Sequence, residues 1–158
     1  MPPQHFCKLI DEICNIARIP NSRLLYEAAD LEIDHVKFTL ADGGDKTENC
    51  VTFYCDFGLL PPQIVRAGAM QRLLELNLSM YGINTPFFSI NSEINHVLLI
   101  GRIPTAEMSP ENLMNALAKH AAQAKEWRRN YYLDAEERSQ QSSGRQSYQD
   151  LIMKRNAA

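Results

Sequence analysis

The chain has 158 residues, of which 45% are hydrophobic and 22% charged, so it is long enough for one globular domain with a buried core. The formal net charge of −3 argues against nucleic acid as a partner, because domains that bind nucleic acid usually carry a basic stripe. No apolar run approaches the ~20 residues that a membrane helix needs, and no secretory signal is recognisable, so we expect a cytosolic protein.

The first predicted element is an amphipathic helix over residues 4–18. Pro20 follows it, and proline disfavours helix in the residue before it, so the helix is expected to end there. Apolar residues recur along the helix at three- and four-residue spacing, which places them on one face: Phe6, Leu9, Ile10, Ile13, Ile16 and Ala17.

Strand sequence follows over residues 30–40. Leu31 and Ile33 occupy odd positions, whereas the apolar residues from Val36 onward occupy even ones. Because the side chains of a strand alternate with a period of two, the chain is expected to bend or reverse at Asp34-His35.

A further strand and a second helix come next. Residues 41–45 form a turn by composition, and residues 50–57 alternate as a strand. Residues 63–81 are expected to be a helix whose apolar side chains cover most of its circumference, so that it is buried on more than one side. In a small domain, a partner subunit would suit the second side.

The remaining elements are two strands and a helix. Residues 87–90 and 97–103 are short apolar strands joined by the polar turn 91–95. Ser109 is a good N-cap for a helix that runs to about Leu133, and Pro110 and Glu111 suit its first turn.

This order of elements predicts an α+β fold: helix, three strands, helix, two strands, helix. Because the strands fall in sequential groups with short turns, the five-stranded sheet should be mostly antiparallel, with helices packed on it. The domain is expected to span residues 1–133. Residues 134–158 are polar, have little to bury and are expected to form a disordered tail.

Catalytic and metal-binding patterns are weak. The four cysteines (Cys7, Cys14, Cys50 and Cys55) lack the spacing of a zinc or redox pair and are expected to be buried or half-buried free thiols. Asp42-Gly43-Gly44-Asp45 lacks the further carboxylates of an EF-hand and is better explained as a hairpin turn. Asp34-His35 is a poor acid–base dyad, because adjacent strand residues face opposite sides. We therefore expect no catalytic residues, no metal, no cofactor and no enzymatic activity.

Six segments occur in a characteristic order along residues 5–133. They are the amphipathic helix 6–17, Leu31-Glu32-Ile33-Asp34, VTFYCDFG at 51–58 before a proline-containing loop, LELNL at 74–78, VLLIGRIP at 97–104, and the helix capped at Ser109-Pro110-Glu111. In this order the chain resembles the Tir chaperone (CesT) family, the class I chaperones of bacterial type III secretion. The similarity is one of pattern, since no single motif among them is diagnostic.

The resemblance implies an ATP-independent homodimer in the bacterial cytoplasm. Such a dimer binds the N-terminal region of one or more secreted effectors and keeps it soluble and ready for export. In the family, the second helix and the next strand contribute to the dimer interface, and effectors use apolar patches near the first helix and first strands. By position, the effector-binding candidates are Phe6, Leu9, Leu31, Ile33, Phe38 and Phe53, and the dimer-interface candidates are Leu73, Leu76, Asn77, Met80, Phe87 and Phe88.

Two other functions remain open at this point. A small-molecule-binding α+β domain would need a concave pocket with converging polar groups. A regulator of the secretion system, acting on one of its components or on a transcription factor, could coexist with chaperone activity. The apolar strand residues also have a simpler interpretation as core, and the sequence alone does not divide them between core and binding surface.

Overall fold

The computed structural model of the chain describes residues 3–43, 49–106 and 108–137. It confirms the predicted α+β class and the predicted order of elements. The elements are α1 (Gln4–Ala17), the 3-10 turn η1 (Ser22–Leu25), β1 (Ala28–Ile33), β2 (Val36–Asp42), β3 (Cys50–Leu59), α2 (Gln63–Ser79), β4 (Phe87–Asn91), β5 (His96–Pro104) and α3 (Pro110–Asn130).

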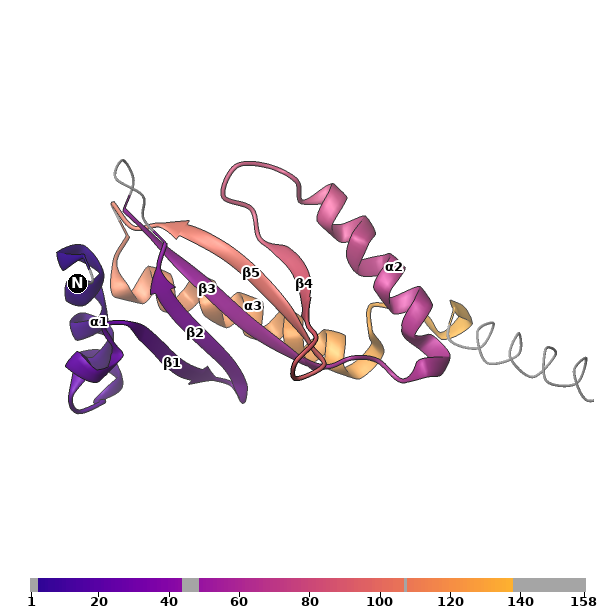
Figure 1. Cartoon of the computed structure of the whole chain (residues 1–158), viewed down its shortest axis with the longest axis horizontal. Coiled ribbons are helices and arrows are strands. Elements are labelled where there is room, and N and C mark those ends of the chain that lie inside the picture. The colour runs from indigo at the N-terminus through magenta and orange to yellow at the C-terminus, as the bar shows by residue number, and fades with distance from the viewer. Residues whose placement is uncertain (1–2, 44–48, 107, 138–158) are drawn as a thin grey trace, which may run out of the picture.

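The five strands form one antiparallel sheet in the order β1-β2-β3-β5-β4. In Figure 1, α1 lies at one end of the elongated molecule and α2 at the other, while α3 runs along the back of the sheet. The two helices that the family resemblance connects with binding are therefore far apart. Within the described ranges, no helix combines the length and apolar character needed to cross a membrane.

The chain reverses at Asp34-His35, as the change in strand parity predicts. Both residues have positive φ angles, 51° and 65°, and Ile33 pairs with Val36 across the turn. A two-residue turn with two left-handed residues matches the right-handed twist of the strands that it joins. β1 and β2 therefore form a tight hairpin, and β1 is left as one edge of the sheet.

β3 is the central strand and contains the main irregularity of the sheet. Its register with β5 shifts between Asp56 and Gly58, where Gly58 has a φ of 104° and donates its N–H to Asp56 Oδ1 at 2.8 Å. This φ lies in the region that favours glycine, so the bulge depends on Gly58.

The core lies between one face of the sheet and the helices α1 and α3. Inward-facing residues of β2, β3 and β5 meet a stripe of α3 in which Ala121 and Ala124 allow close approach, and Trp127 is fully buried at its end. Phe57 and Trp127 pack edge to face, with ring centroids 6.1 Å apart. The cysteines 14, 50 and 55 are buried free thiols and Cys7 is half-buried, as expected.

α3 ends three residues earlier than the predicted boundary near Leu133. Tyr131 and Tyr132 both adopt a left-handed conformation with φ 54°, and the Tyr131 N–H closes the helix on Trp127 O at 2.7 Å. The chain then turns, and residues 135–137 form a short helical turn that contacts α2. Of the predicted tail, residues 138–158 lie outside the described residues.

Candidate binding surfaces

The effector-binding candidates divide into core and margin. Phe6, Leu9, Phe38 and Phe53 are buried in the core between the sheet and the helices, with exposed fractions between 0 and 6%. Leu31 and Ile33 are half-buried and pack against the margin of that core. In this structure the four buried side chains offer no area to a client, and they serve to hold α1 and the sheet together.

Exposed apolar side chains do occur close by, on α1, on the turn after it and on η1. We call Ile16, Ile19 and Leu24 the α1–η1 surface; Leu24 is 81% exposed. Half-buried Leu25 and Tyr26 lie next to them in the sequence and pack against the core. Helical periodicity identifies Ile16 but not Ile19 or Leu24, because these two lie beyond the end of α1.

Hydrogen bonds fix η1 against α1. Asp11 Oδ1 accepts from Ser22 Oγ at 2.5 Å and from Tyr26 Oη at 2.7 Å. The hydrogen bond from Ser22, followed by that from Tyr26, lowers the pKa of the Asp11 carboxyl. These two hydrogen bonds help to hold η1, and with it Leu24, against α1.

A larger apolar surface covers α2, the loop after it and β4. Of the dimer-interface candidates, Leu73 is buried, Phe87 is exposed and the other four are half-buried. The most exposed neighbours are Leu78 (80%), Tyr81 (90%) and Ile83 (94%). We call the α2–β4 surface the exposed group Leu74, Leu78, Tyr81, Ile83 and Ile90. Phe87, which pairs with Ile100 and alternates with Phe88, faces the helix-free side of the sheet.

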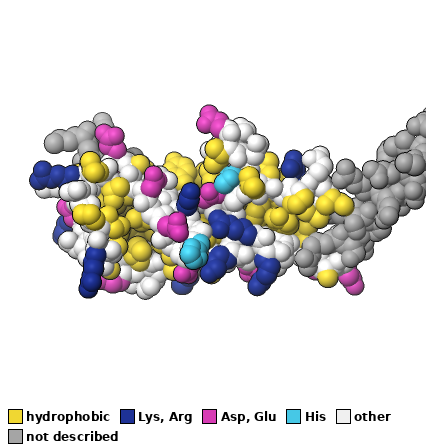
Figure 2. Space-filling view, turned by 90° about the horizontal axis from the view of Figure 1, so that it is seen from below, with side chains coloured by type: hydrophobic (Ala, Val, Ile, Leu, Met, Phe, Trp, Pro, Cys, Tyr) yellow, Lys and Arg dark blue, Asp and Glu magenta, His cyan; other side chains and the backbone are white. Residues whose placement is uncertain are grey.

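Figure 2 shows the distribution of apolar and charged side chains on one face of the molecule. Apolar side chains gather toward the α1 end and toward the α2 end, and basic, acidic and histidine side chains lie between them. Monomeric proteins rarely expose several large apolar side chains together unless the patch binds something. The chain thus has two separate candidate binding surfaces.

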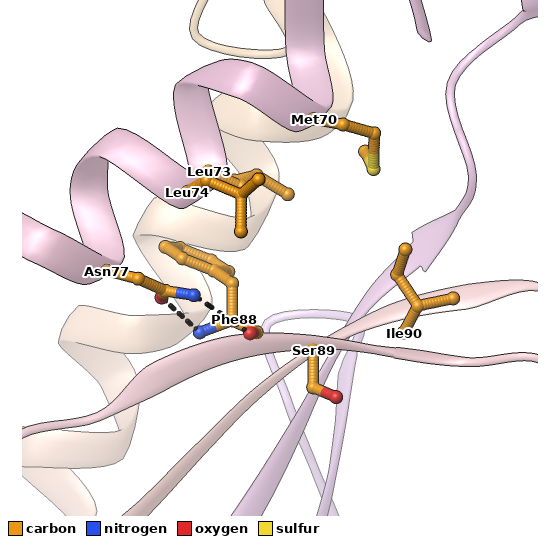
Figure 3. Close-up of a pocket in the computed structure, with 7 residues that line it drawn as sticks. All are labelled: Met70, Leu73, Leu74, Asn77, Phe88, Ser89 and Ile90. Carbon is orange, nitrogen blue, oxygen red and sulfur yellow. Dashed lines mark hydrogen bonds between the residues drawn. The ribbon is translucent and has the colours of Figure 1, made fainter. Parts of the chain in front are cut away.

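A groove of about 230 Å³ runs between α2 and β4. In Figure 3, Leu73 and Leu74 project from the helix toward the strand, Phe88 and Ile90 project toward the helix, and Ser89 points to the other face of the sheet. Met70 and Asn77 complete the lining. The groove is apolar apart from Asn77 and Ser89.

Asn77 joins the helix to the edge of the sheet. Its Nδ2 donates to Phe88 O at 3.1 Å, and its Oδ1 accepts the Phe88 N–H at 2.6 Å, as the dashed lines in Figure 3 show. The amide therefore satisfies both backbone groups of Phe88, as a neighbouring strand would. At this point the β4 edge is closed to another strand.

The helix-free face of the sheet carries a shallow hollow of about 520 Å³. Tyr54 and Leu98, which alternate with buried core residues, line it together with Ile94 and several polar side chains. At its margin, His96 Nδ1 lies 2.7 and 2.9 Å from the two carboxylate oxygens of Asp56. The hollow lies between the two ends of the molecule.

Cys55, Asp34 and His35 are described side chains of the types that catalytic sites use. Burial raises the pKa of Cys55 to about 12, so this thiol stays protonated and is a poor nucleophile. Asp34 and His35 sit in the exposed β1–β2 turn, where the nearest acidic partner of His35 Nδ1 is Glu32 Oε1 at 3.6 Å. Across the described ranges, no group of three or more metal-ligating side chains comes together. Of the supposed calcium loop, Gly44 and Asp45 lie outside the described residues.

Comparison with known proteins identifies the family. The model of the Tir chaperone protein (CesT) family matches residues 44–128, which is more than half of the chain. A chain in the crystal structure of the ExsC-ExsE complex has a similar fold, with a TM-score of 0.59 and 19% sequence identity over 78% of this chain and 90% of that one. No match was found among curated protein sequences.

The family match includes β3, α2, β4, β5 and most of α3. It therefore covers both sides of the groove and Asn77, which joins them. Together with the shared fold, it confirms the resemblance found in the sequence. The chain belongs to the Tir chaperone (CesT) family, the class I chaperones of type III secretion.

Proposed function

We propose that this protein is a homodimeric chaperone of the bacterial cytoplasm that binds the N-terminal region of a type III secreted effector. It keeps that region soluble and export-competent without ATP. The observation that carries the proposal is the pair of apolar surfaces at opposite ends of the protomer, α1–η1 and α2–β4. One surface suits a second copy of the chain, and the other suits a client.

The α2–β4 surface is assigned to the dimer. It is the larger of the two, and its helix exposes Leu74 and Leu78, which lie one turn apart on a side that the protomer does not cover. A stable dimer buries roughly 1,200–2,000 Å² in total, and large apolar side chains clustered at the centre of such an interface supply most of its energy.

The α1–η1 surface is assigned to the client. The fold is similar to that of a chain solved in a complex of two proteins, ExsC with ExsE, which supports a protein partner. An apolar effector segment left in water would self-associate, whereas contact with a preformed surface covers it. Burial of a disordered segment is favourable only after its ordering cost is offset, so we expect the client to use an extended area that includes the helix-free hollow.

Co-expression with each neighbouring reading frame tests the client assignment. One product should co-purify with the chaperone in the absence of nucleotide, and its N-terminal fragment should suffice. Leu24→Asp should reduce the recovery of the client, because it places a charge in the α1–η1 surface. Ile64→Asp is the matched control, since Ile64 is also exposed but lies at the start of α2, away from the α1–η1 surface and the hollow. Equal recovery with both variants would contradict the assignment.

A further inference from the structure

α2 is held to its own protomer by few contacts. Only Val65, Ala69 and Leu73 among its 17 residues are buried, and its main strand contact is with β4. A hollow of about 510 Å³ lies between α2 and α3 and is lined by both helices, for example by Leu76 on α2 and Gln123 on α3. The placement of α2 relative to the body of the protein therefore needs another support.

The segment that follows α3 supplies a second support. We call residues 131–137 the strap. Its first residues are fixed to α3: Tyr132 N–H donates to Asn130 Oδ1 at 2.9 Å, and Tyr132 Oη reaches back to donate to Gln123 O at 2.9 Å. The Trp127 and Tyr131 rings pack edge to face with centroids 5.0 Å apart. These contacts direct the chain from the end of α3 toward α2.

Leu133 is the apolar contact of the strap. It is 4% exposed and packs with Val65 and Ala69 in a small cluster separate from the main core. Met70 and Tyr131 close the sides of this cluster. Two of the three buried residues of α2 thus pack with Leu133.

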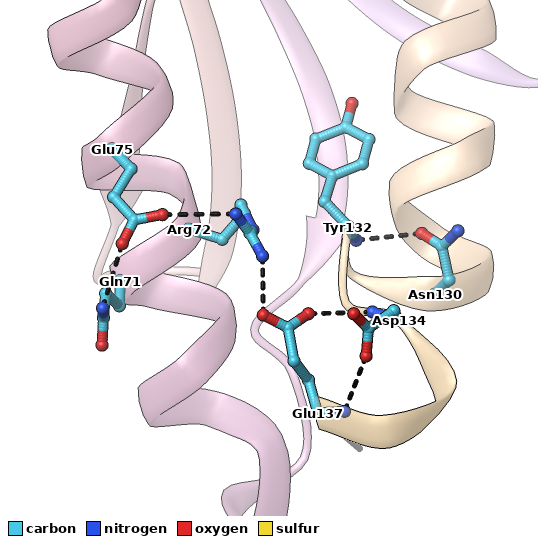
Figure 4. Close-up of polar contacts among 7 residues, drawn as sticks. All are labelled: Gln71, Arg72, Glu75, Asn130, Tyr132, Asp134 and Glu137. Atoms are coloured by element: carbon cyan, nitrogen blue, oxygen red, sulfur yellow. Dashed lines mark hydrogen bonds and ion pairs between the residues drawn. The ribbon is translucent and has the colours of Figure 1, made fainter.

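Glu137 is the polar contact. The Asp134 N–H donates to Glu137 Oε2 at 2.9 Å and the Glu137 N–H donates to Asp134 Oδ1 at 2.7 Å, a reciprocal arrangement of the capping-box type. Glu137 Oε1 accepts from Arg72 Nη2 at 2.7 Å, and Arg72 Nη1 also pairs with Glu75 at 3.3 Å (Figure 4). Because the capping box fixes the Glu137 side chain, less entropy is lost when it pairs with Arg72.

We propose that the strap positions α2 and thereby presents the α2–β4 surface in the geometry that a second copy requires. Leu133 acts as a positioning residue at the first half of the helix, Glu137 acts at its middle, and Asn77 acts near its end. The proposal rests on the proposed function insofar as it assigns the dimer to α2. The strap lies beyond residue 128, where the family match ends, so its sequence is not part of the matched pattern.

Hydrogen exchange of the full chain tests the strap. Leu133→Ser should accelerate exchange of the α2 amides about tenfold or more, which corresponds to ~1.4 kcal/mol of local stability, and leave β3 and β5 unchanged. Glu137→Gln should have a smaller effect of about two- to fivefold, because the ion pair is partly exposed. Glu136→Gln is the matched control, as Glu136 is the exposed neighbour, and it should change nothing. Leu133→Met should behave almost like the original chain.

The same variants are also compared in a Leu78→Asp background, which disrupts the proposed dimer. Faster α2 exchange of Leu133→Ser in both backgrounds, together with a weaker dimer of Leu133→Ser in the original background, would support the positioning role of the strap. Unchanged α2 exchange in Leu133→Ser, or equal acceleration in β3 and β5, would overturn it. If the original chain is a monomer but α2 still responds to Leu133→Ser, the strap stands and the dimer assignment fails.

Discussion

Arg128 joins three segments that are distant in the sequence. Its Nε donates to Phe57 O at 2.9 Å, its Nη2 to Asp56 O at 2.7 Å and its Nη1 to His35 O at 3.3 Å. One guanidinium therefore ties the end of α3 to the bulge of β3 and to the β1–β2 turn. Its planar fork of donors suits this task, which a lysine ammonium cannot reproduce.

Replacement of Arg128 tests this connection. Arg128→Ala should lower the free energy of unfolding by about 1–3 kcal/mol, because carbonyl groups of the bulge lose their donors. Arg128→Lys should recover only part of the loss. Urea denaturation measures both, with Arg129→Ala as a matched control at the adjacent exposed arginine. Equal stability of the Arg128 and Arg129 variants would show that the connection contributes nothing.

Asp11 predicts a pH dependence for the α1–η1 surface. A carboxyl whose pKa is lowered on folding contributes stability that is fully present above its ordinary value of 3.8 and is lost as the pH falls through its folded-state pKa. Asp11→Asn removes this contribution. Urea denaturation between about pH 6 and pH 3 should therefore show a smaller acid-induced loss of stability in the variant than in the original chain. Parallel pH profiles would contradict this role.

At the scale of elements, sequence pattern predicts the existence and order of helices and strands but not their neighbours. The reversal at Asp34-His35 follows from strand parity alone. The placement of β5 next to β3, with β4 at the edge, cannot be predicted from strand parity. It depends on where the connection through α2 returns the chain to the sheet. The end of α3 is also missed, since Tyr131 and Tyr132 adopt left-handed conformations that glycine or asparagine would normally signal.

Asn77 forms the hydrogen bonds between α2 and β4, and its replacement tests how far the position of α2 depends on them. Asn77→Ala leaves the N–H and C=O of Phe88 without their partner and should cost about 1–3 kcal/mol in unfolding free energy and weaken the dimer. Asn77→Asp keeps the acceptor but opposes a carboxylate to Phe88 O, so it should be at least as unfavourable. Urea denaturation and light scattering measure the two effects. A dimer of unchanged affinity in both variants would contradict a positioning role for Asn77.

At the scale of the whole molecule, the sequence predicts which residues are apolar but not which of them are left uncovered. Phe6 and Phe53 are large apolar residues of the kind that binding sites use, yet they lie in the core. Leu24 lies in the 3-10 turn η1 and is exposed. Core and client surface use the same residue types, so only the three-dimensional packing separates them. The family resemblance predicts which elements carry the surfaces, and the structure shows which apolar residues on those elements are exposed.

The proposed function assigns the α2–β4 surface to the dimer and the α1–η1 surface to the client, so charges placed in the two surfaces should have different effects. Leu78→Asp should separate the dimer, since it places a charge in the α2–β4 surface, while Leu24→Asp should leave the dimer intact. Both residues are about equally exposed in the protomer, 80% and 81%, so each variant controls for the other.

Light scattering coupled to size exclusion, at micromolar concentration, is the most direct measurement. The original chain and Leu24→Asp should have twice the 18.0 kDa mass of one chain, and Leu78→Asp should have the mass of one chain. A single-chain mass for the unaltered protein, or a dimer that persists in Leu78→Asp, would contradict the assignment of the α2–β4 surface to a second copy.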